Sequence, residues 1–388
     1  MKILFVTTCY PSQELPQYCV FLEQQAQALK NMGHTVDVLI PVESVESDHS
    51  VEKEMYHGIE ITKCQIRTGK KKDMIFPTKL NADDHRQLAA LISGKRYDAV
   101  SFHFGGLRIV RSVLEICKKN NCKYIHHFHG LNIWYEFHEA HKYLEKYFRL
   151  QKYLVYRSCD AVVGVSNKVC QQFSKRIKQV PHYTVYNGVD TERFLSRDRK
   201  FFENGKIRIL CVANLIKLKG QDYLIDAVAG LKKKGLNVEL ILAGRGPDEE
   251  KLKEQANRLN LHDWVQFVGY VHYDQIAELM NACDLFVMPS YYEALGCVYL
   301  EAMSAGMITV GVWNQGIDEI IVDGKNGFLV QEKSVADLER VLQKIIGLNH
   351  NELKQISCAA IKDMEKYTWK ESAAELSKVY IDVLSKEQ

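Results

Sequence analysis

The sequence predicts an α/β protein made of two doubly wound, Rossmann-like domains. Its 388 residues suit two domains of ordinary size. Short apolar runs typical of buried strands alternate with segments of helical periodicity, in two successive series. Strands joined through helices form parallel sheets, whose ligands bind beyond the carboxyl ends of the strands. We therefore expect an N-terminal domain over residues 1–190, a C-terminal domain over residues 191–369, and a central cleft that both domains face.

The first series opens with a strand–helix–strand unit. Apolar Lys2–Thr8, helical Tyr18–Met32 and apolar Thr35–Ile40 have the order of a βαβ motif. Further strands are expected at Gly58–Thr62, Asp98–Phe102, Lys123–Phe128 and Ala161–Val165, and further helices at Asp83–Ile92, Leu107–Lys118, Phe137–Arg157 and Ser166–Ile177. An Asn-Gly turn within Tyr183–Asp190 closes this half, and the charged, irregular residues 191–205 indicate a linker.

The second series repeats the alternation. Strands are expected at Ile207–Ala213, Val238–Leu242, Val265–Phe267, Leu285–Met288 and Met307–Val310, and helices at Gln221–Lys233, Asp248–Asn260, Tyr273–Asn281 and from about Gly296 onward. A last helix begins at Lys370, and no strand follows it. The second half therefore also predicts a doubly wound parallel sheet.

Composition indicates a globular, cytoplasmic protein. The chain is 46% hydrophobic and 26% charged, and its 11 cysteines include no CxxC pair, which favours a reduced protein without structural zinc. No signal peptide is recognised, and no apolar run approaches the ~20 residues of a membrane span. Residues 1–190 carry 26 Lys and Arg against 19 Asp and Glu, so the first half is basic. We expect no nucleic-acid partner.

The stretch Pro289–Gly306 organises the candidate site. It has the order strand, short loop, helix, which places Glu293 on the loop and Glu301 about two turns into the helix. The unpaired N–H groups at the helix start, near Gly296, suit a phosphate. Two carboxylates beside a phosphate site can accept hydrogen bonds from the hydroxyls of a ribose and a sugar. The stretch therefore predicts a nucleotide-sugar pocket.

This stretch resembles the signature of retaining glycosyltransferases of family four, which have the GT-B fold. The resemblance rests on Glu293, Gly296, Glu301 and Gly306 at their mutual spacing. It implies transfer of a sugar from a nucleotide-sugar donor, a UDP-sugar on the family's base rate, to a hydroxyl acceptor with retention of configuration. It implies no metal or other cofactor, and a C-terminal helix (about 370–388) that packs on the first domain.

The loop that follows the first strand of the second domain carries candidate diphosphate contacts. Lys219 matches the family's diphosphate lysine, and a fixed cation there would stabilise the departing diphosphate. Asn214 stands where the family commonly has an arginine, and Lys217 is a candidate substitute. The alternative for both lysines is a solvated position on a loop.

The resemblance also implies contacts between the backbone and the donor. Gly244 lies in a turn near the nucleotide, while Gly269 and Tyr270 lie at the edge that contacts the base. At the start of the signature helix the implied donor contacts are Leu295, Gly296, Cys297 and Val298. Tight turns explain the glycines equally well.

The segment Ile125–Gly130 contains three histidines. Alternation places His127 and His129 on one face of the strand and His126 on the other. His129-Gly130 matches the family's His-Gly pair, so His129 is the implied contact to the donor sugar and a catalytic candidate beside Glu293 and Lys219. His127 is interpreted as a packed strand residue. Two histidines at this spacing can ligate zinc, but no cysteine or carboxylate stands beside them at ligand spacing.

Two features of the first half concern the acceptor side. The loop Tyr10–Gln17 lacks the Gly-Gly pair of many relatives and resembles a subgroup that makes cell-envelope polysaccharides, so we expect a saccharide or lipid-linked saccharide acceptor. The helix Phe137–Arg157 mixes aromatic and basic residues, as peripheral proteins on the inner face of the plasma membrane do. A core helix with a solvated back fits the same pattern.

Other functions fit parts of this pattern. A non-catalytic GT-B partner that binds a nucleotide would not require Glu293, Lys219, His129 and Glu301 together. A GT-B phosphorylase or epimerase would share the fold, although the pair of glutamates and the His-Gly motif argue against an epimerase. Sugar transfer accounts for all these residues at once.

Overall fold

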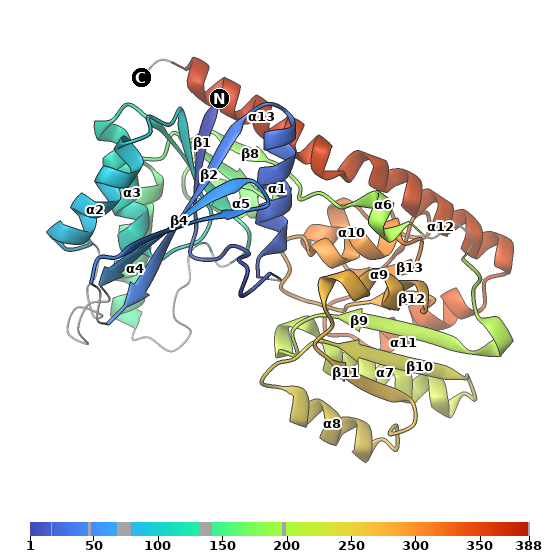
Figure 1. Cartoon of the computed structure of the whole chain (residues 1–388). Coiled ribbons are helices and arrows are strands. Elements are labelled where there is room, and N and C mark those ends of the chain that lie inside the picture. The colour runs from blue at the N-terminus through green and yellow to red at the C-terminus, as the bar shows by residue number, and fades with distance from the viewer. Residues whose placement is uncertain are drawn as a thin grey trace. The chain divides into compact units, whose positions relative to one another are not determined.

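The computed structural model describes residues 1–16, 18–45, 48–67, 79–131, 133, 142–195 and 199–386. The chain divides into two compact units, which are described separately (Figure 1). Unit 1 comprises Met1–Tyr186 and Trp369–Gln388, and unit 2 comprises Asn187–Thr368. Among the described helices, none combines the length and the apolar character that a membrane span requires.

Unit 1 contains an eight-stranded sheet of order β3-β4-β2-β1-β5-β6-β7-β8. Its strands are β1 (Lys2–Val6), β2 (Thr35–Ser44), β3 (Val51–Tyr56), β4 (Ile59–Arg67), β5 (Ala99–Phe102), β6 (Lys123–Phe128), β7 (Ala161–Gly164) and β8 (His182–Thr184). All neighbours are parallel except β3 and β4, which form an antiparallel hairpin. The strand order reverses between β1 and β5, so that is where a ligand is expected.

The described part of unit 1 contains six α-helices, and side chains cap two of them. They are α1 (Val20–Asn31), α2 (Ala82–Ser93), α3 (Leu107–Lys119), α4 (Lys142–Tyr156), α5 (Asn167–Ser174) and α13 (Trp369–Ser385). The Asn81 side chain accepts hydrogen bonds from the first N–H groups of α2, and Ser166 does the same for α5. These side chains accept hydrogen bonds from N–H groups of the first turn, which have no partner within the helix.

The C-terminal helix α13 belongs to unit 1 because one of its faces is apolar. Leu376, Val379, Tyr380 and Val383 recur at helical spacing and are buried in the same core as strand β1. The Tyr380 hydroxyl also lies 2.6 Å from Ser101 Oγ, at the buried centre of the sheet. The last helix therefore completes the core of the N-terminal strands (Figure 1).

Unit 2 contains a six-stranded sheet of order β11-β10-β9-β12-β13-β14, and all its neighbours are parallel. The strands are β9 (Ile207–Val212), β10 (Val238–Ala243), β11 (Val265–Gly269), β12 (Leu285–Val287), β13 (Ile308–Val312) and β14 (Phe328–Val330). The α-helices are α6 (Thr191–Phe194), α7 (Gln221–Lys233), α8 (Glu249–Arg258), α9 (Tyr273–Asn281), α10 (Cys297–Ser304), α11 (Val335–Ile346) and α12 (His350–Met364). Short 3-10 turns include η2 (Lys217–Lys219) and η3 (Gly316–Glu319).

The boundary between the units lies four residues before the predicted one, after Tyr186 rather than after residue 190. The Val189 N–H donates to the Tyr367 carbonyl at 2.8 Å, and the Asn187 amide donates to Cys297 Sγ at 3.1 Å. These bonds tie the segment to unit 2. The predicted linker is also wrong for Arg199, because its guanidinium donates to the carbonyls of three unit 2 residues: Met280, Cys283 and Ala305.

Strands β3, β8 and β14 were not predicted from the sequence. Strand β3 is an edge strand paired only with β4, and most of its residues are exposed, so it shows no apolar run. Strands β8 and β14 have three residues each, which is too short for a periodic signal. Each observed sheet therefore has edge strands in addition to the predicted ones.

The basic, aromatic helix buries one of its basic and one of its aromatic residues. Its described part, α4, buries Lys152, whose ammonium donates to the Ile133 carbonyl at 3.2 Å, and it buries Tyr156 in the core. The predicted residues 137–141 lie outside the described ranges. The solvent-facing side of α4 carries two leucines, Leu150 and Leu154, between the exposed basic residues Lys146 and Arg157.

Candidate active site

The carboxyl ends of β9 and β12 mark the place where the strand order of unit 2 reverses. The chain passes from β9 to β10 and β11 on one side, and from β12 to β13 and β14 on the other. Open parallel sheets bind their ligands at this point. Turn η2 follows β9, and the loop that carries Glu293 follows β12. Lys219 and Glu293 therefore come from the ends of adjacent strands, although they are 74 residues apart in sequence.

Lys219 and Glu293 form a close ion pair. The Lys219 Nζ lies 2.5 Å from Glu293 Oε2, and the two side chains are 22% and 12% exposed. The Glu293 backbone is fixed on both sides, because its N–H donates to Gln315 Oε1 at 2.9 Å and its carbonyl accepts from the Gly316 N–H at 3.0 Å. A half-buried ion pair on a fixed loop is strongly oriented, since both charges have lost much of their water.

Two glycines bring this pair to the start of α10. Gly220 follows Lys219 with φ 72°, and a Cβ there would lie 2.3 Å from the Pro289 carbonyl oxygen. Gly296 precedes α10 with φ 78°, and a Cβ there would lie 3.3 Å from the Glu293 carboxyl carbon. The carboxyl of Glu293 and the ammonium of Lys219 therefore lie beside the N-terminus of α10, where unpaired N–H groups favour an anion.

Glu301 lies in the second turn of α10. Burial raises the pKa of its carboxyl from 4.5 to about 7, while the charge of Arg193 and a hydrogen bond with Tyr273 act in the opposite direction. Arg193 lies 4.3 Å from the centre of the Tyr273 ring and pairs with Asp274 at 2.5 Å. Glu301 thus changes its charge near neutral pH, and its ionised form can accept hydrogen bonds from neighbouring hydroxyls.

The other predicted donor contacts at the strand ends also lie close together. The Gly244 N–H donates to the Gly269 carbonyl at 2.7 Å, and a Cβ on Gly244 would lie 2.0 Å from the Ala213 carbonyl oxygen. Ala213 precedes Asn214, so Asn214, Gly244 and Gly269 follow one edge across β9, β10 and β11. Tyr270 comes next and is 40% exposed.

Three further predicted contacts lie at the start of α10. Leu295 is buried, Val298 is half-buried, and Cys297 accepts a hydrogen bond from the Asn187 amide. Burial and the charge of Glu301 raise the pKa of Cys297 to about 12, so its thiol stays protonated at neutral pH. At this position the Cys297 side chain is a packed, neutral group rather than a nucleophile.

In unit 1, His129 follows β6, close to the reversal of strand order. Its Nε2 lies 3.0 Å from Nδ1 of His103, which follows the neighbouring strand β5. The Phe21 and Phe104 rings lie 5.1 and 4.9 Å from the His129 ring, and burial lowers the pKa of His129 to about 3. A neutral imidazole has one donor and one acceptor nitrogen. If His103 Nδ1 donates to His129 Nε2, then His129 Nδ1 is the donor nitrogen; if it accepts, His129 Nδ1 is the acceptor. The sequence analysis missed His103.

His127 is buried one pleat before His129 on the same face of β6. Its Nε2 lies 3.2 Å from Ser101 Oγ, which in turn bonds the Tyr380 hydroxyl. His126 points to the other face, where its ring stacks on Phe102 at 5.4 Å. Burial lowers the pKa of His127 well below 6.5. His127 is therefore a packed strand residue with a hydrogen-bonded ring.

Comparison with known proteins identifies the family. Glycosyltransferase Family 4 matches residues 20–193, and Glycosyl transferases group 1 matches residues 192–363, so together they span both units. The chain belongs to the family-four glycosyltransferases. This glycosyltransferase is 27% identical over 396 residues to an uncharacterized glycosyltransferase of Methanocaldococcus jannaschii, with 98% of each chain covered. It is 29% identical over 357 residues to mannosylfructose-phosphate synthase of Agrobacterium fabrum, covering 84% of this chain and 77% of that one.

Solved structures establish that the glycosyltransferase has the GT-B fold. Sucrose-phosphate synthase of Thermosynechococcus elongatus superposes with a TM-score of 0.74 at 15% identity, covering 99% of each chain. HepE of Anabaena, in complex with UDP and glucose, superposes with a TM-score of 0.73 at 19% identity, covering 98% of this chain and 100% of that one. At these identities the likeness concerns the fold.

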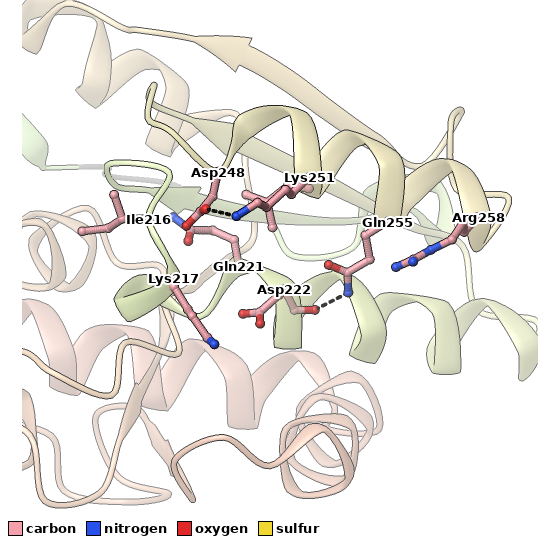
Figure 2. A pocket seen from close by; sticks show the side chains of 9 residues that line it. Ile216, Lys217, Gln221, Asp222, Asp248, Lys251, Gln255 and Arg258 are labelled. Carbon is pink, nitrogen blue, oxygen red and sulfur yellow. Dashed lines mark hydrogen bonds and ion pairs between the residues drawn. The ribbon is translucent and has the colours of Figure 1, made fainter. Parts of the chain in front are cut away.

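Asn214 and Lys217 are two further predicted donor contacts, on the loop that follows β9. Asn214, in place of the common arginine, uses its carbonyl to accept a hydrogen bond from the Gln221 amide at 3.0 Å. Lys217 is on the same turn as Lys219 but lines a separate pocket of about 280 Å³ between α7 and α8, together with Asp222 and Asp248 (Figure 2). In unit 2, Lys219 is thus the lysine that lies against Glu293 and α10.

Proposed function

We propose that this enzyme transfers a sugar from a nucleotide-sugar donor, a UDP-sugar, to a hydroxyl acceptor with retention of configuration. The observation that carries the proposal is the close pair of Lys219 and Glu293 at the N-terminus of α10. A cation and a helix start suit a diphosphate, while the adjacent carboxylate suits sugar hydroxyls or a developing positive charge.

Lys219 and the start of α10 have the role of holding the diphosphate. As the bond to the sugar breaks, negative charge grows on the diphosphate, and a fixed ammonium stabilises that charge more in the transition state than in the ground state. The ammonium is paired with Glu293 at 2.5 Å. Donor binding would therefore place a phosphate within reach of a cation that is already oriented.

Glu293 has the role of holding the sugar. Its carboxylate can accept hydrogen bonds from sugar hydroxyls and can stabilise positive charge at the anomeric carbon. Two backbone hydrogen bonds to Gln315 and Gly316 fix its loop, so little reorganisation is needed during the reaction. In a front-face mechanism the departing phosphate oxygen accepts the proton of the acceptor hydroxyl, so no separate base is required.

The remaining groups have the role of recognising the nucleotide and the sugar. Ionised Glu301 accepts hydrogen bonds from the ribose hydroxyls, and the edge at Gly269 and Tyr270 contacts the base. His129 presents its buried Nδ1, which has no partner among the described residues, to a hydroxyl of the donor sugar. A buried nitrogen of this kind gains most from a partner that arrives with the substrate.

Glu293→Gln tests this proposal. The variant keeps the shape of the side chain but loses its charge, so we expect kcat for donor turnover to fall about 100-fold or more. Glu278→Gln, at an exposed position on α9, is the matched control and should keep normal kcat. An unchanged kcat in a folded Glu293→Gln variant would refute the role of Glu293. Proton NMR of the new glycosidic bond tests retention separately, because an inverted anomer would contradict it.

We also propose that the enzyme acts on the anionic inner surface of the membrane, in the synthesis of cell-envelope polysaccharides or glycolipids. Support comes from the solvent-facing side of α4. Lys146, Leu150, Leu154 and Arg157 are exposed at helical spacing, so two leucines lie between two cations. Apolar side chains flanked by basic ones suit the boundary between headgroups and acyl chains.

Vesicle sedimentation tests membrane binding. Leu150→Asp and Leu154→Asp together should reduce co-sedimentation with anionic phospholipid vesicles by about tenfold. Each replaces an apolar side chain that would enter the lipid boundary with a negative charge that anionic headgroups repel. Ile381→Asp, at a 58% exposed position on α13, is the control of the same kind in the same unit. Equal binding by all three proteins would exclude α4 as the membrane-binding face.

A further inference from the structure

Three histidines of unit 1 converge at the ends of adjacent strands. Strand pairing places Phe102 of β5 beside His126 of β6, so His103, one residue later, stands next to His127. His129 lies one pleat further along the same face of the chain. One nitrogen from each of the three rings His103, His127 and His129 lies within 4.8 Å of the other two. Within the described ranges, no other three His, Cys, Asp or Glu side chains converge in this way.

Much of the hydrogen-bonding capacity of these rings is unused. His103 Nδ1 and His129 Nε2 lie 3.0 Å apart and can satisfy each other. The remaining nitrogens, His103 Nε2 and His129 Nδ1, are buried without a partner in the described part of the chain. These two nitrogens point away from the pair, so the nitrogens that an ion between the rings would contact are the facing ones, His103 Nδ1 and His129 Nε2.

We propose that His103, His127 and His129 form a binding site for a divalent transition-metal ion, with Zn²⁺ as the best fit. Neutral imidazoles are preferred ligands of Zn²⁺, and three of them leave a fourth tetrahedral position for water. With Zn–N bonds of 2.0–2.1 Å, tetrahedral ligand nitrogens lie about 3.3 Å apart. The His103–His129 separation of 3.0 Å is already close to that value, so His127 requires the main adjustment.

The surroundings of His127 support this site. Its Nε2 bonds Ser101 Oγ at 3.2 Å, and Ser101 bonds the Tyr380 hydroxyl at 2.6 Å. The hydrogen bond at Nε2 leaves Nδ1 as the nitrogen for the ion. A metal-ligating histidine usually has its other nitrogen held in this way, which fixes the orientation of the ring. Here that group is the Ser101 hydroxyl, which is itself hydrogen-bonded to Tyr380 of the C-terminal helix α13.

Occupation of the site would inhibit sugar transfer. This part rests on the proposed function, because an ion at His129 Nε2 leaves Nδ1 as an N–H donor only, so this nitrogen can no longer accept a hydrogen bond from a hydroxyl of the donor sugar. The site is thus a regulatory one, distinct in chemistry from a catalytic metal. Zn²⁺ should lower donor turnover by wild-type protein, and a chelator should restore it.

Cobalt spectroscopy tests the site without any need for turnover. Full-length protein freed of metal is titrated with Co²⁺, and we expect one equivalent to give the intense visible bands of a tetrahedral ion. A sulfur-to-cobalt charge-transfer band would show cysteine ligation and overturn the proposal. The absence of a saturable visible band would also overturn it.

Variants locate the site. His103→Gln and His127→Gln should each weaken Zn²⁺ binding, measured by competition with a chromophoric indicator, by about tenfold or more. His126→Gln is the matched control, because His126 is buried in the same strand but faces away from the cluster. His182→Gln is a second control at an exposed position, in case His126→Gln fails to fold. Unchanged affinity in both cluster variants would refute the assignment.

Inhibition is measured separately. If Co²⁺ and Zn²⁺ bind at the cluster and donor turnover is unaffected, the regulatory role is wrong while the metal site stands. If Glu293→Gln retains full activity, the proposed function fails, and the cobalt bands still report the site. The two proposals can therefore fail independently.

Discussion

Nucleotide affinity should depend on pH through Glu301. Burial raises the pKa of this carboxyl from 4.5 to about 7, and only the ionised form accepts two hydrogen bonds from ribose. With a pKa near 7, about one tenth of the carboxyl is ionised at pH 6 and about nine tenths at pH 8. The dissociation constant for UDP should therefore fall about tenfold as the pH rises from 6 to 8.

Isothermal titration calorimetry of wild type and Glu301→Gln at pH 6, 7 and 8 measures this effect. The glutamine side chain of the variant cannot ionise, and both proteins bind the same ligand. Any effect of phosphate ionisation on affinity is therefore the same in both. The difference between the two proteins in how the dissociation constant changes with pH gives the contribution of Glu301 ionisation. Equal slopes would show that the carboxyl does not bind ribose in its charged form.

Glu301 should also affect stability, with a definite sign. Its pKa is higher in the folded state than in the unfolded state, so between pH 4.5 and 7 the folded protein binds more protons and the free energy of unfolding decreases as the pH rises. A shift from 4.5 to about 7 corresponds to about 3 kcal/mol. Relative to wild type, Glu301→Gln should gain up to this amount across the same window, as urea unfolding at pH 5 and pH 8 would measure. A constant difference would contradict the burial argument.

Two further predictions concern the η2 turn. Lys219→Met should lower kcat for donor turnover about 100-fold or more, whereas Lys217→Met, at a residue that lines the pocket between α7 and α8, should lose less than about fivefold. Similar losses in steady-state assays would show that both lysines bind the diphosphate. Gly220→Ala should lower the free energy of unfolding by about 2–4 kcal/mol, because its Cβ would lie 2.3 Å from the Pro289 carbonyl oxygen at a positive φ. Gly235→Ala, also at a positive φ but with free space around it, should cost about 1 kcal/mol, and equal costs in urea unfolding would contradict the steric reasoning.

The doubly wound sheets could be predicted because their central strands are buried on both faces. Strands such as β9 and β12 are nearly continuous apolar runs that stand out from the helices between them. Strand β3 gives no such signal, since it lies at the sheet edge with most of its side chains in water. The segment at 191–205 looks like a linker for a related reason. Its charged residue Arg199 is satisfied by carbonyl groups supplied from distant parts of unit 2, which no local pattern reveals.

The same distinction separates the predicted part of the site from the missed part. Lys219 and Glu293 were recognisable because each belongs to a motif, and because both motifs follow strands that a doubly wound sheet places near its reversal of order. His103 belongs to no motif, and its meaning depends on the register that aligns Phe102 with His126. Only that register brings the His103 ring to His127 and His129. Two histidines are too few ligands for zinc, and His103 makes the set three. Local pattern therefore predicts the charged candidates for the reaction, whereas strand pairing determines which side chains lie beside one another and can share a ligand.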